Sequence, residues 1–266
     1  MAIQAIHSVK RIEQQFHTGE EPVLVMCSDV NTYVCKYMRS SAAAYKLVCE
    51  LIGAQMAKAW QLNTPDTALV MIKPSHWEGV HLMHSVSAPS LGSKWMDSVV
   101  DITPSTYEKV PATAEMLNHL MKIALFDFWI ANEDRNANNA NLMYDVGVGK
   151  FVSIDYGCIF NTATFDYPLS QLTSTDTILW SDLFDHLIQG QDKNNIRSLA
   201  EQLKLDYRHS IQVCNSLKTE IVDVIPKEWN VPSTVIMEKV EQLFDETWTS
   251  EVWNNFIECL NENIES

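Results

Sequence analysis

The sequence predicts a two-lobed α+β protein, with a small β-rich N-terminal lobe and a mainly helical C-terminal lobe. Three observations support this fold class. Runs of β-forming residues fill positions 1–39, helical periodicity begins at Ser40, and the pattern is helical from about Asp176 to the end. An irregular stretch rich in Ser, Pro and Gly extends to about Pro111 and marks the candidate boundary. We therefore expect lobes at 1–95 and 96–266.

The predicted N-terminal lobe contains a sheet and one helix. Two β-rich runs in residues 21–38 are separated by the turn-forming segment Ser-Asp-Val-Asn, which predicts a hairpin. Apolar residues then repeat at helical spacing through residues 40–60, and Ser40 or Ser41 can cap that helix. The run Asp-Thr-Ala-Leu-Val-Met-Ile at 66–72 predicts a further strand.

The predicted C-terminal lobe begins with a long helix over residues 112–132. It is apolar on almost all sides, so we expect it to be largely buried. A polar loop follows at 133–141, and then two short strands, 141–145 and 150–156, are joined by a Gly-containing turn. The remaining chain is predicted to be helical, with breaks near Gly190 and at 226–232.

Composition and charge argue against several classes of function. The net charge is −15, and the acidic excess lies in the C-terminal third, which argues against broad binding of nucleic acid. No apolar run approaches the roughly 20 residues of a membrane span, and the N-terminus lacks the features of a signal peptide. The six cysteines form no CxxC pair and the histidines no HxxxH or HxH spacing, which argues against disulfides and zinc. We expect a cytoplasmic protein that does not bind membranes.

Three polar residues in and after the loop have the chemistry of phosphoryl transfer. Asp134 and Asn139 lie in the loop, and Asp155 ends the strand that follows the turn. One carboxylate can orient an attacking hydroxyl, and an amide oxygen with a second carboxylate can hold Mg²⁺. Each residue taken alone is better explained as a turn former, because Asn and Asp favour tight turns and such turns are common. Their common spacing, Asp-x4-Asn followed by Ile-Asp-x-Gly, favours the functional interpretation.

The segments FDFWIANEDRNANNANLMYD and FVSIDYGCIF resemble the catalytic segment of HipA-like kinases, which share a fold with phosphoinositide kinases. The resemblance implies a protein-kinase-like fold and extends over most of residues 10–230. It implies that Asp134 is the catalytic aspartate and that Asn139 and Asp155 are Mg²⁺ ligands. TYVCKYM and the helical KLVCELIG are similar to the family's nucleotide-binding lysine and its glutamate partner, which would be Lys36 and Glu50.

Lys36 also has a physical argument of its own. It lies among β-branched and aromatic residues, where a lysine is costly unless it is paired or reaches water. A lysine on an edge strand that points to solvent is the simpler alternative. Glu50 on the following helix would provide the pairing partner, so we expect an ion pair that faces the α- and β-phosphates of a nucleotide.

The loop at 16–22 is in the position of a phosphate-binding loop but departs from the usual composition. Thr18 and Gly19 provide the expected hydroxyl and a single glycine, whereas Glu20 and Glu21 would repel phosphate if they pointed inward. Three interpretations stay open: the two carboxylates face solvent, nucleotide binding is weak, or their charge imitates a phosphorylated and inactive loop.

The resemblance implies an ATP- and Mg²⁺-dependent kinase for serine or threonine of a protein. Several HipA-like relatives are toxins with cognate antitoxins, so an antitoxin is an implied partner. A kinase for a small molecule or lipid head group is one alternative, because the fold also accepts such substrates. A nucleotide-binding pseudokinase is the other, and the composition of the 16–22 loop favours it.

Overall fold

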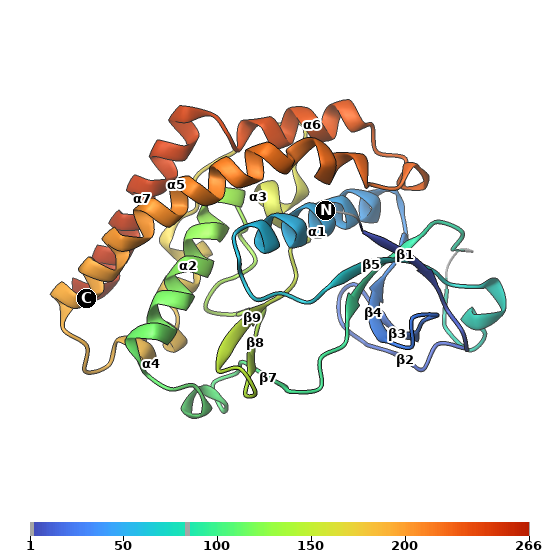
Figure 1. The fold of residues 1–266 in the computed structure, drawn as a ribbon, viewed down its shortest axis with the longest axis horizontal. Coiled ribbons are helices and arrows are strands. Elements are labelled where there is room, and N and C mark those ends of the chain that lie inside the picture. The colour runs from blue at the N-terminus through green and yellow to red at the C-terminus, as the bar shows by residue number, and fades with distance from the viewer. Residues whose placement is uncertain (1–2, 83–85, 266) are drawn as a thin grey trace.

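The computed structural model describes residues 3–82 and 86–265. Residues 1–2 of the predicted N-terminal strand region and residues 83–85 of the predicted irregular stretch lie outside this description. The N-terminal part is rich in strands and the C-terminal part is mainly helical, and the two lie side by side (Figure 1). The predicted two-lobed α+β fold is confirmed.

A six-stranded sheet forms most of the N-terminal part. Its strands are β1 (Gln4–His7), β2 (Gln14–Gln15), β3 (Val23–Met26), β4 (Thr32–Lys36), β5 (Thr67–Met71) and β6 (Ser90–Lys94). Their spatial order is β1-β5-β6-β4-β3-β2, and every pair is antiparallel except β1 with β5. The predicted hairpin is confirmed as β3 and β4, and the predicted strand at 66–72 as β5.

The assignment of the stretch up to Pro111 as irregular was wrong for β6, a central strand of the sheet. Its sequence, Ser-Leu-Gly-Ser-Lys, has the small residues of a loop. These residues are small because the sheet is crowded there. A Cβ on Gly92 would lie 2.8 Å from a Val70 methyl and 3.1 Å from the Tyr33 Cβ, so the strand requires glycine.

Helix α1 (Ser41–Ala59) connects β4 to β5. The side chain of Ser40 accepts a hydrogen bond from the Ala43 amide at 3.2 Å, so the first of the two predicted caps is confirmed. The helix packs against α3 (Ile159–Ala163) and α5 (Lys193–Asp223) of the C-terminal part, and Trp60 after its end stacks on Trp129 at 5.3 Å. Helix α1 is therefore fixed to the helical part of the molecule.

A second, three-stranded sheet lies between the large sheet and the helices (Figure 1). It contains β7 (Val99–Asp101), β8 (Leu142–Asp145) and β9 (Lys150–Ser153) in that order. Strands β8 and β9 are the predicted pair after the polar loop. Strand β7 was not predicted, because three residues of edge strand give too short a pattern.

The helical part consists of a buried helix surrounded by others. Its helices are α2 (Ala114–Ile130), α3 (Ile159–Ala163), α4 (Asp182–Ile188), α5 (Lys193–Asp223), α6 (Ser233–Gln242) and α7 (Glu246–Glu265), with short 3₁₀ turns η2 (Tyr107–Lys109), η3 (Ser174–Asp176), η4 (Ile178–Trp180) and η5 (Lys227–Trp229). The 3₁₀ turn η1 (Pro74–Trp77) lies between β5 and β6 of the N-terminal part, and Trp77 packs in the apolar cluster of that sheet. The predicted helical breaks near Gly190 and at 226–232 are confirmed. Between Phe160 and Ala163 the backbone is left-handed, with φ between 53° and 61°, so α3 is a turn rather than an ordinary helix.

The buried apolar residues form two clusters. The smaller cluster lies within the six-stranded sheet and includes Val25, Tyr33 and Val70. The larger cluster surrounds α2, which is buried almost all round as predicted, and it also contains the apolar residues of α1. Helix α1 is thus part of the sheet region in sequence and part of the helical core in packing.

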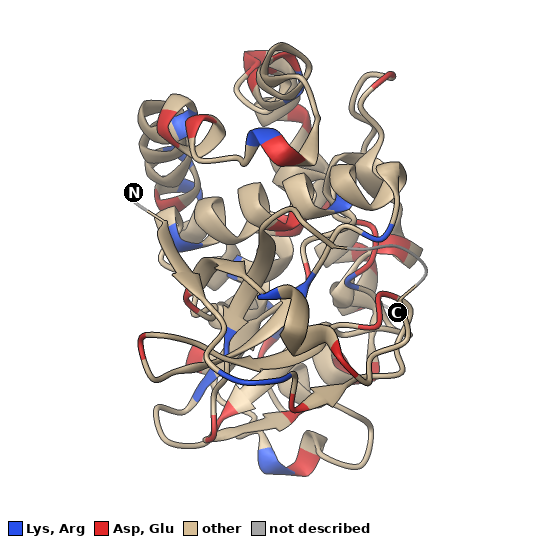
Figure 2. Cartoon of the chain, turned by 90° about the vertical axis from the view of Figure 1, so that its right-hand side faces the viewer, with Lys and Arg blue, Asp and Glu red and all other residues tan. Residues whose placement is uncertain are grey.

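Figure 2 marks the positions of Lys and Arg in blue and those of Asp and Glu in red, and the two kinds are interspersed along the upper helices of this view. Within the described part of the chain, no helix combines the length and the apolar character needed to cross a membrane.

Candidate active site

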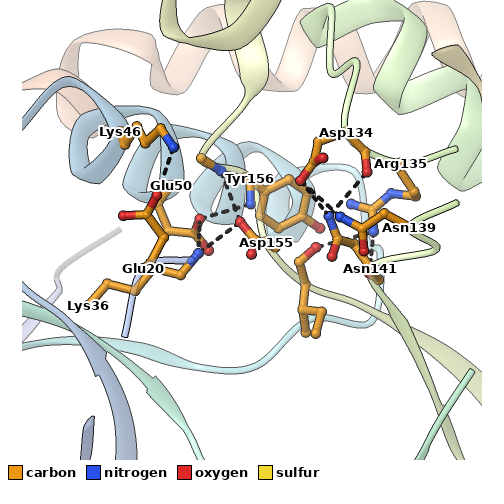
Figure 3. Close-up of polar contacts among 12 residues, drawn as sticks. Glu20, Lys36, Lys46, Glu50, Asp134, Arg135, Asn139, Asn141, Asp155 and Tyr156 are labelled. Carbon is orange, nitrogen blue, oxygen red and sulfur yellow. Dashed lines mark hydrogen bonds and ion pairs between the residues drawn. The ribbon is translucent and has the colours of Figure 1, made fainter. Parts of the chain in front are cut away.

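Three charged side chains from three distant elements meet between the two parts of the molecule. The ammonium of Lys36, at the end of β4, lies 2.9 Å from Oε2 of Glu50 on α1 and 2.8 Å from Oδ1 of Asp155, which follows β9 (Figure 3). The expected Lys36–Glu50 ion pair is therefore present. The alternative in which Lys36 points to solvent from an edge strand is wrong, because β4 is an interior strand and only 21% of the side chain is exposed.

Burial and charge shift the proton affinities of this group in opposite directions. Burial raises the pKa of Glu50 to about 7, although the charge of Lys36 opposes this effect. Burial also acts to raise the pKa of Asp155, but the Lys36 ammonium and its hydrogen bond outweigh burial and hold this pKa below its usual range. Burial lowers the pKa of Lys36 less than its two carboxylate partners raise it, so the lysine stays charged.

The backbone after Asp155 is fitted closely against α1. Asp155 has left-handed backbone geometry with φ 60°, and the next amide, that of Tyr156, donates to Oε2 of Glu50 at 2.9 Å. The Tyr156 ring packs over Gly53 of α1, where a Cβ would lie 2.4 Å from the Cβ of Tyr156. Glycine at position 53 therefore allows the Asp155 segment to approach the helix that carries Glu50.

The polar loop at 133–141 directs three of its side chains at one another. Oδ2 of Asp134 accepts hydrogen bonds from the side-chain amides of Asn139 at 3.1 Å and Asn141 at 3.0 Å. Asn136 has the role of a turn former, because its side chain accepts from the Asn138 amide at 3.0 Å and its backbone pairs with that of Asn139. The turn-former interpretation is therefore correct for Asn136, whereas the functional interpretation of Asp134 and Asn139 stays a prediction.

Two adjoining cavities meet at the Lys36 cluster. The first, about 580 Å³, has mostly apolar walls that include Val34, Ala54, Trp95, Met143 and Ile154. The second, about 420 Å³, is polar, and all seven predicted site residues line it: Thr18, Gly19, Lys36, Glu50, Asp134, Asn139 and Asp155. An apolar cavity that opens into a charged one suits a ligand with a flat ring and an anionic tail.

The 16–22 loop closes one side of the polar cavity. Glu20 faces the cavity, and its Oε1 accepts from Nζ of Lys46 at 2.7 Å. Glu21 is not among the residues that line either cavity. It forms an ion pair with Arg39 at 2.7 Å, and Arg39 also donates a hydrogen bond to the Gly19 carbonyl at 3.3 Å. The interpretation that both carboxylates face solvent is therefore wrong for Glu20.

Comparison with known sequences identifies the family. A sequence model of the HipA-like kinases matches residues 9–256, which is most of the chain. The chain belongs to the HipA-like kinase family. Members of this family are phosphotransferases, and the resemblance expected over most of residues 10–230 is confirmed. No curated protein sequence matches this HipA-like chain.

Two solved structures are similar to this chain. This HipA-like kinase is similar to the proinflammatory kinase CtkA of Helicobacter pylori, with a TM-score of 0.53 and 13% sequence identity over 98% of this chain and 99% of that one. The Golgi casein kinase gives a TM-score of 0.45 and 10% identity over 97% of this chain and 73% of that one. The predicted protein-kinase-like fold is confirmed by the first of these similarities.

A buried ion pair supports the polar loop at 133–141 of this HipA-like kinase, and sequence reasoning missed it. Arg135 is fully buried, and its Nε lies 2.7 Å from Oδ2 of Asp127 on α2. The guanidinium also donates to the carbonyls of Asn141 and Ile154, and it lies over the Tyr156 ring at 5.4 Å. Arg135 therefore joins the loop to the Asp155 strand, and it does not pair with Asp134.

Proposed function

We propose that this chain is an ATP- and Mg²⁺-dependent kinase that transfers the γ-phosphoryl group to a serine or threonine hydroxyl of a protein. The observation that carries the proposal is the Lys36–Glu50–Asp155 cluster at the junction of an apolar and a polar cavity, with Asp134 in the same polar cavity. The apolar cavity would accept the adenine ring and the polar one the phosphates. Family membership supports phosphoryl transfer, and the protein substrate rests on family resemblance alone.

The side chains of the polar cavity fit Mg²⁺ by their chemistry. Asn139 and Asp155 would hold the ion through an amide and a carboxylate oxygen, which are ligands that this hard cation prefers. Among the described residues, no group of three or more His, Cys, Asp or Glu is arranged to hold a metal. Two protein ligands, Asn139 and Asp155, are typical of Mg²⁺, because this ion retains water and shares its coordination with substrate phosphates. The ion would neutralise charge that develops on the phosphoryl oxygens.

The remaining residues would bind the phosphates, hold the lysine that binds them, and deprotonate the substrate hydroxyl. Lys36 would bind the phosphates, with Glu50 holding its ammonium in place. The substrate hydroxyl oxygen would form a bond to the γ-phosphorus while the bond between that phosphorus and the β,γ-bridging oxygen breaks, so that ADP leaves. Asp134 would accept the hydroxyl proton, and Asn139 and Asn141 hold its carboxylate through hydrogen bonds.

A direct test is transfer of radiolabelled phosphate from ATP to protein, together with the intact mass of the chain after incubation with ATP and Mg²⁺. Labelled protein or a mass increase of one phosphate, lost in Asp134→Asn, supports the proposal. Nucleotide binding without transfer would instead support a pseudokinase. That second candidate is favoured by one observation, the carboxylate of Glu20 in the phosphate cavity. Transfer to small hydroxyl compounds alone would indicate a small-molecule kinase.

A further inference from the structure

The polar cavity contains a second ammonium group, that of Lys46, which has no role in the mechanism above. Lys46 lies on α1 four residues before Glu50, so both side chains leave the same face of the helix. Both also line the polar cavity, and Figure 3 shows Lys46 and Glu20 beside Lys36 and Glu50. Lys46 therefore faces the same space as Lys36 from a different direction.

Lys46 lies at the end of the site away from the apolar cavity. It lines the polar cavity together with Asp134 and Asn139, whereas the walls of the apolar cavity do not include it. A nucleotide whose ring fills the apolar cavity would extend its phosphates from Lys36 towards Asp134. The Lys46 ammonium would then meet the outer phosphates rather than the ring or the ribose.

The present partner of Lys46 is a carboxylate on the loop that covers the phosphates. Oε1 of Glu20 lies 2.7 Å from Nζ of Lys46, and this hydrogen bond raises the pKa of the lysine, which stays charged. A carboxylate and a phosphate group bind an ammonium in the same way, through short charge-assisted hydrogen bonds. Glu20 thus provides Lys46 with the kind of contact that a phosphate would make.

We propose that Lys46 is a second phosphate-binding lysine for the outer phosphates of ATP, and that Glu20 occupies it until the nucleotide displaces the carboxylate. This inference rests on the proposed function, because it assumes that the nucleotide is ATP. Glu20 shares the cavity with three further acidic residues, Glu50, Asp134 and Asp155, against two lysines. A polyphosphate bound there would meet less repulsion with Glu20 turned away, so Glu20 opposes binding and Lys46 favours it.

The adjacent residue provides a matched control for a purely structural role. Glu21 also forms an ion pair between the loop and the region of α1, but its partner is Arg39, and neither residue lines a cavity. If the Glu20–Lys46 pair only fastened the loop, removing it would weaken nucleotide binding just as removing the Glu21–Arg39 pair would. If Glu20 occupies a phosphate position, neutralising Glu20 alone strengthens binding.

The experiment is calorimetric titration of the purified chain with ATP and with adenosine, both in the presence of Mg²⁺, for the wild type, Lys46→Met, Glu20→Gln and Glu21→Gln. We expect Lys46→Met to weaken ATP binding about tenfold or more, the size of one charge-assisted contact. We expect Glu20→Gln to strengthen ATP binding by about threefold to tenfold. Adenosine affinity should change less than about twofold in both variants, and Glu21→Gln should not strengthen ATP binding.

Thermal unfolding of each variant verifies that it is folded. Four results would then overturn the inference. Weaker ATP binding in Glu20→Gln would mean that the pair only fastens the loop. An equal loss of ATP and adenosine affinity in Lys46→Met would assign Lys46 a structural role. ATP binding that neither substitution alters would overturn this inference and leave the proposed function standing. Absence of ATP binding in both the wild type and Glu20→Gln would overturn the two proposals together.

Discussion

The ammonium of Lys36 and the carboxylate of Asp155 are joined at 2.8 Å across 119 positions of the sequence. We propose that Lys36 binds the phosphates and that Asp155 binds the metal. In the structure each of these two residues is therefore paired with another residue of the same site. The contact fixes the end of β4 against the segment after β9. A nucleotide that brings Mg²⁺ would exchange this ion pair for contacts with its own phosphates and metal.

The first prediction concerns Asp155, the proposed metal ligand. ATP should raise the melting temperature of the wild type more with Mg²⁺ than with EDTA, because the metal would strengthen ATP binding. A ligand at about 100 times its Kd stabilises the native state by about 2.7 kcal/mol. Asp155→Asn should abolish the difference between the two conditions. Differential scanning fluorimetry measures this. A Mg²⁺-dependent shift that survives in Asp155→Asn would remove this residue from the metal site.

The second prediction concerns Lys36 and Glu50. Lys36→Met should weaken ATP binding by about 10- to 100-fold, because it removes the ammonium and keeps the apolar stem. Glu50→Gln should affect binding less and reduce turnover more, since its role is to hold the lysine. Titration with ATP and a transfer assay separate the two effects. The control is Lys58→Met on the same helix, where the lysine pairs with Asp66 instead. Wild-type affinity in Lys36→Met would contradict the assignment.

The third prediction concerns Asp134, the proposed catalytic aspartate. Asp134→Asn should lower phosphoryl transfer by about 10²- to 10⁴-fold, the usual contribution of a general base, with ATP affinity nearly unchanged. Asn138→Ala is the control, because Asn138 is in the same loop, is exposed and lines neither cavity. Melting temperature, ATP affinity and transfer are measured on one preparation of each variant. Transfer that persists at the wild-type rate in Asp134→Asn would refute the role.

The fourth prediction concerns pH and His119 of α2. Burial, and then the charges of Lys150 and Lys122, lower the pKa of His119 from its ordinary value of 6.5 to about 4. Between these two values the unfolded chain takes up a proton that the folded chain does not, so stability is full above pH 6.5 and falls as the pH decreases towards 4. The loss is at most about 3.5 kcal/mol, at about 1.4 kcal/mol for each pH unit.

This prediction is measured by urea unfolding at several pH values. His119→Asn should flatten the decline, because asparagine does not titrate and its side-chain oxygen can accept the hydrogen bond that Nδ1 now accepts from the Phe151 amide at 3.3 Å. An identical decline in His119→Asn and the wild type would show that other groups cause it.

The sequence was most informative where one local pattern determines the structure. The β3–β4 hairpin, the Ser40 cap and the buried helix α2 follow from turn formers, capping chemistry and apolar periodicity. The spacing of Asp134, Asn139 and Asp155 likewise predicted residues that line one cavity. Family resemblance added Lys36 and Glu50, whose meeting depends on how the sheet packs against α1.

The features that were missed depend on neighbours distant in the sequence. The small residues of β6 suggest a loop until Val70 and Tyr33 are known to crowd Gly92. The direction of Glu20 depends on Lys46, 26 positions later. Arg135 and Asp127 carried one local signal, since a charged residue within the apolar run at the end of α2 and another just after it require partners.

The position of α1, between strands of the sheet in sequence but within the helical core in packing, has a consequence for producing fragments of the chain. The helix lies between β4 and β5 in sequence, yet its apolar residues pack in the larger cluster with α2. A fragment that ends at residue 95 would expose this apolar surface, so we expect it to aggregate rather than fold. In hydrogen-exchange experiments the amides of α1 should be protected as long as those of α2, while the amides of β1 and β2 at the edges of the sheet exchange earlier.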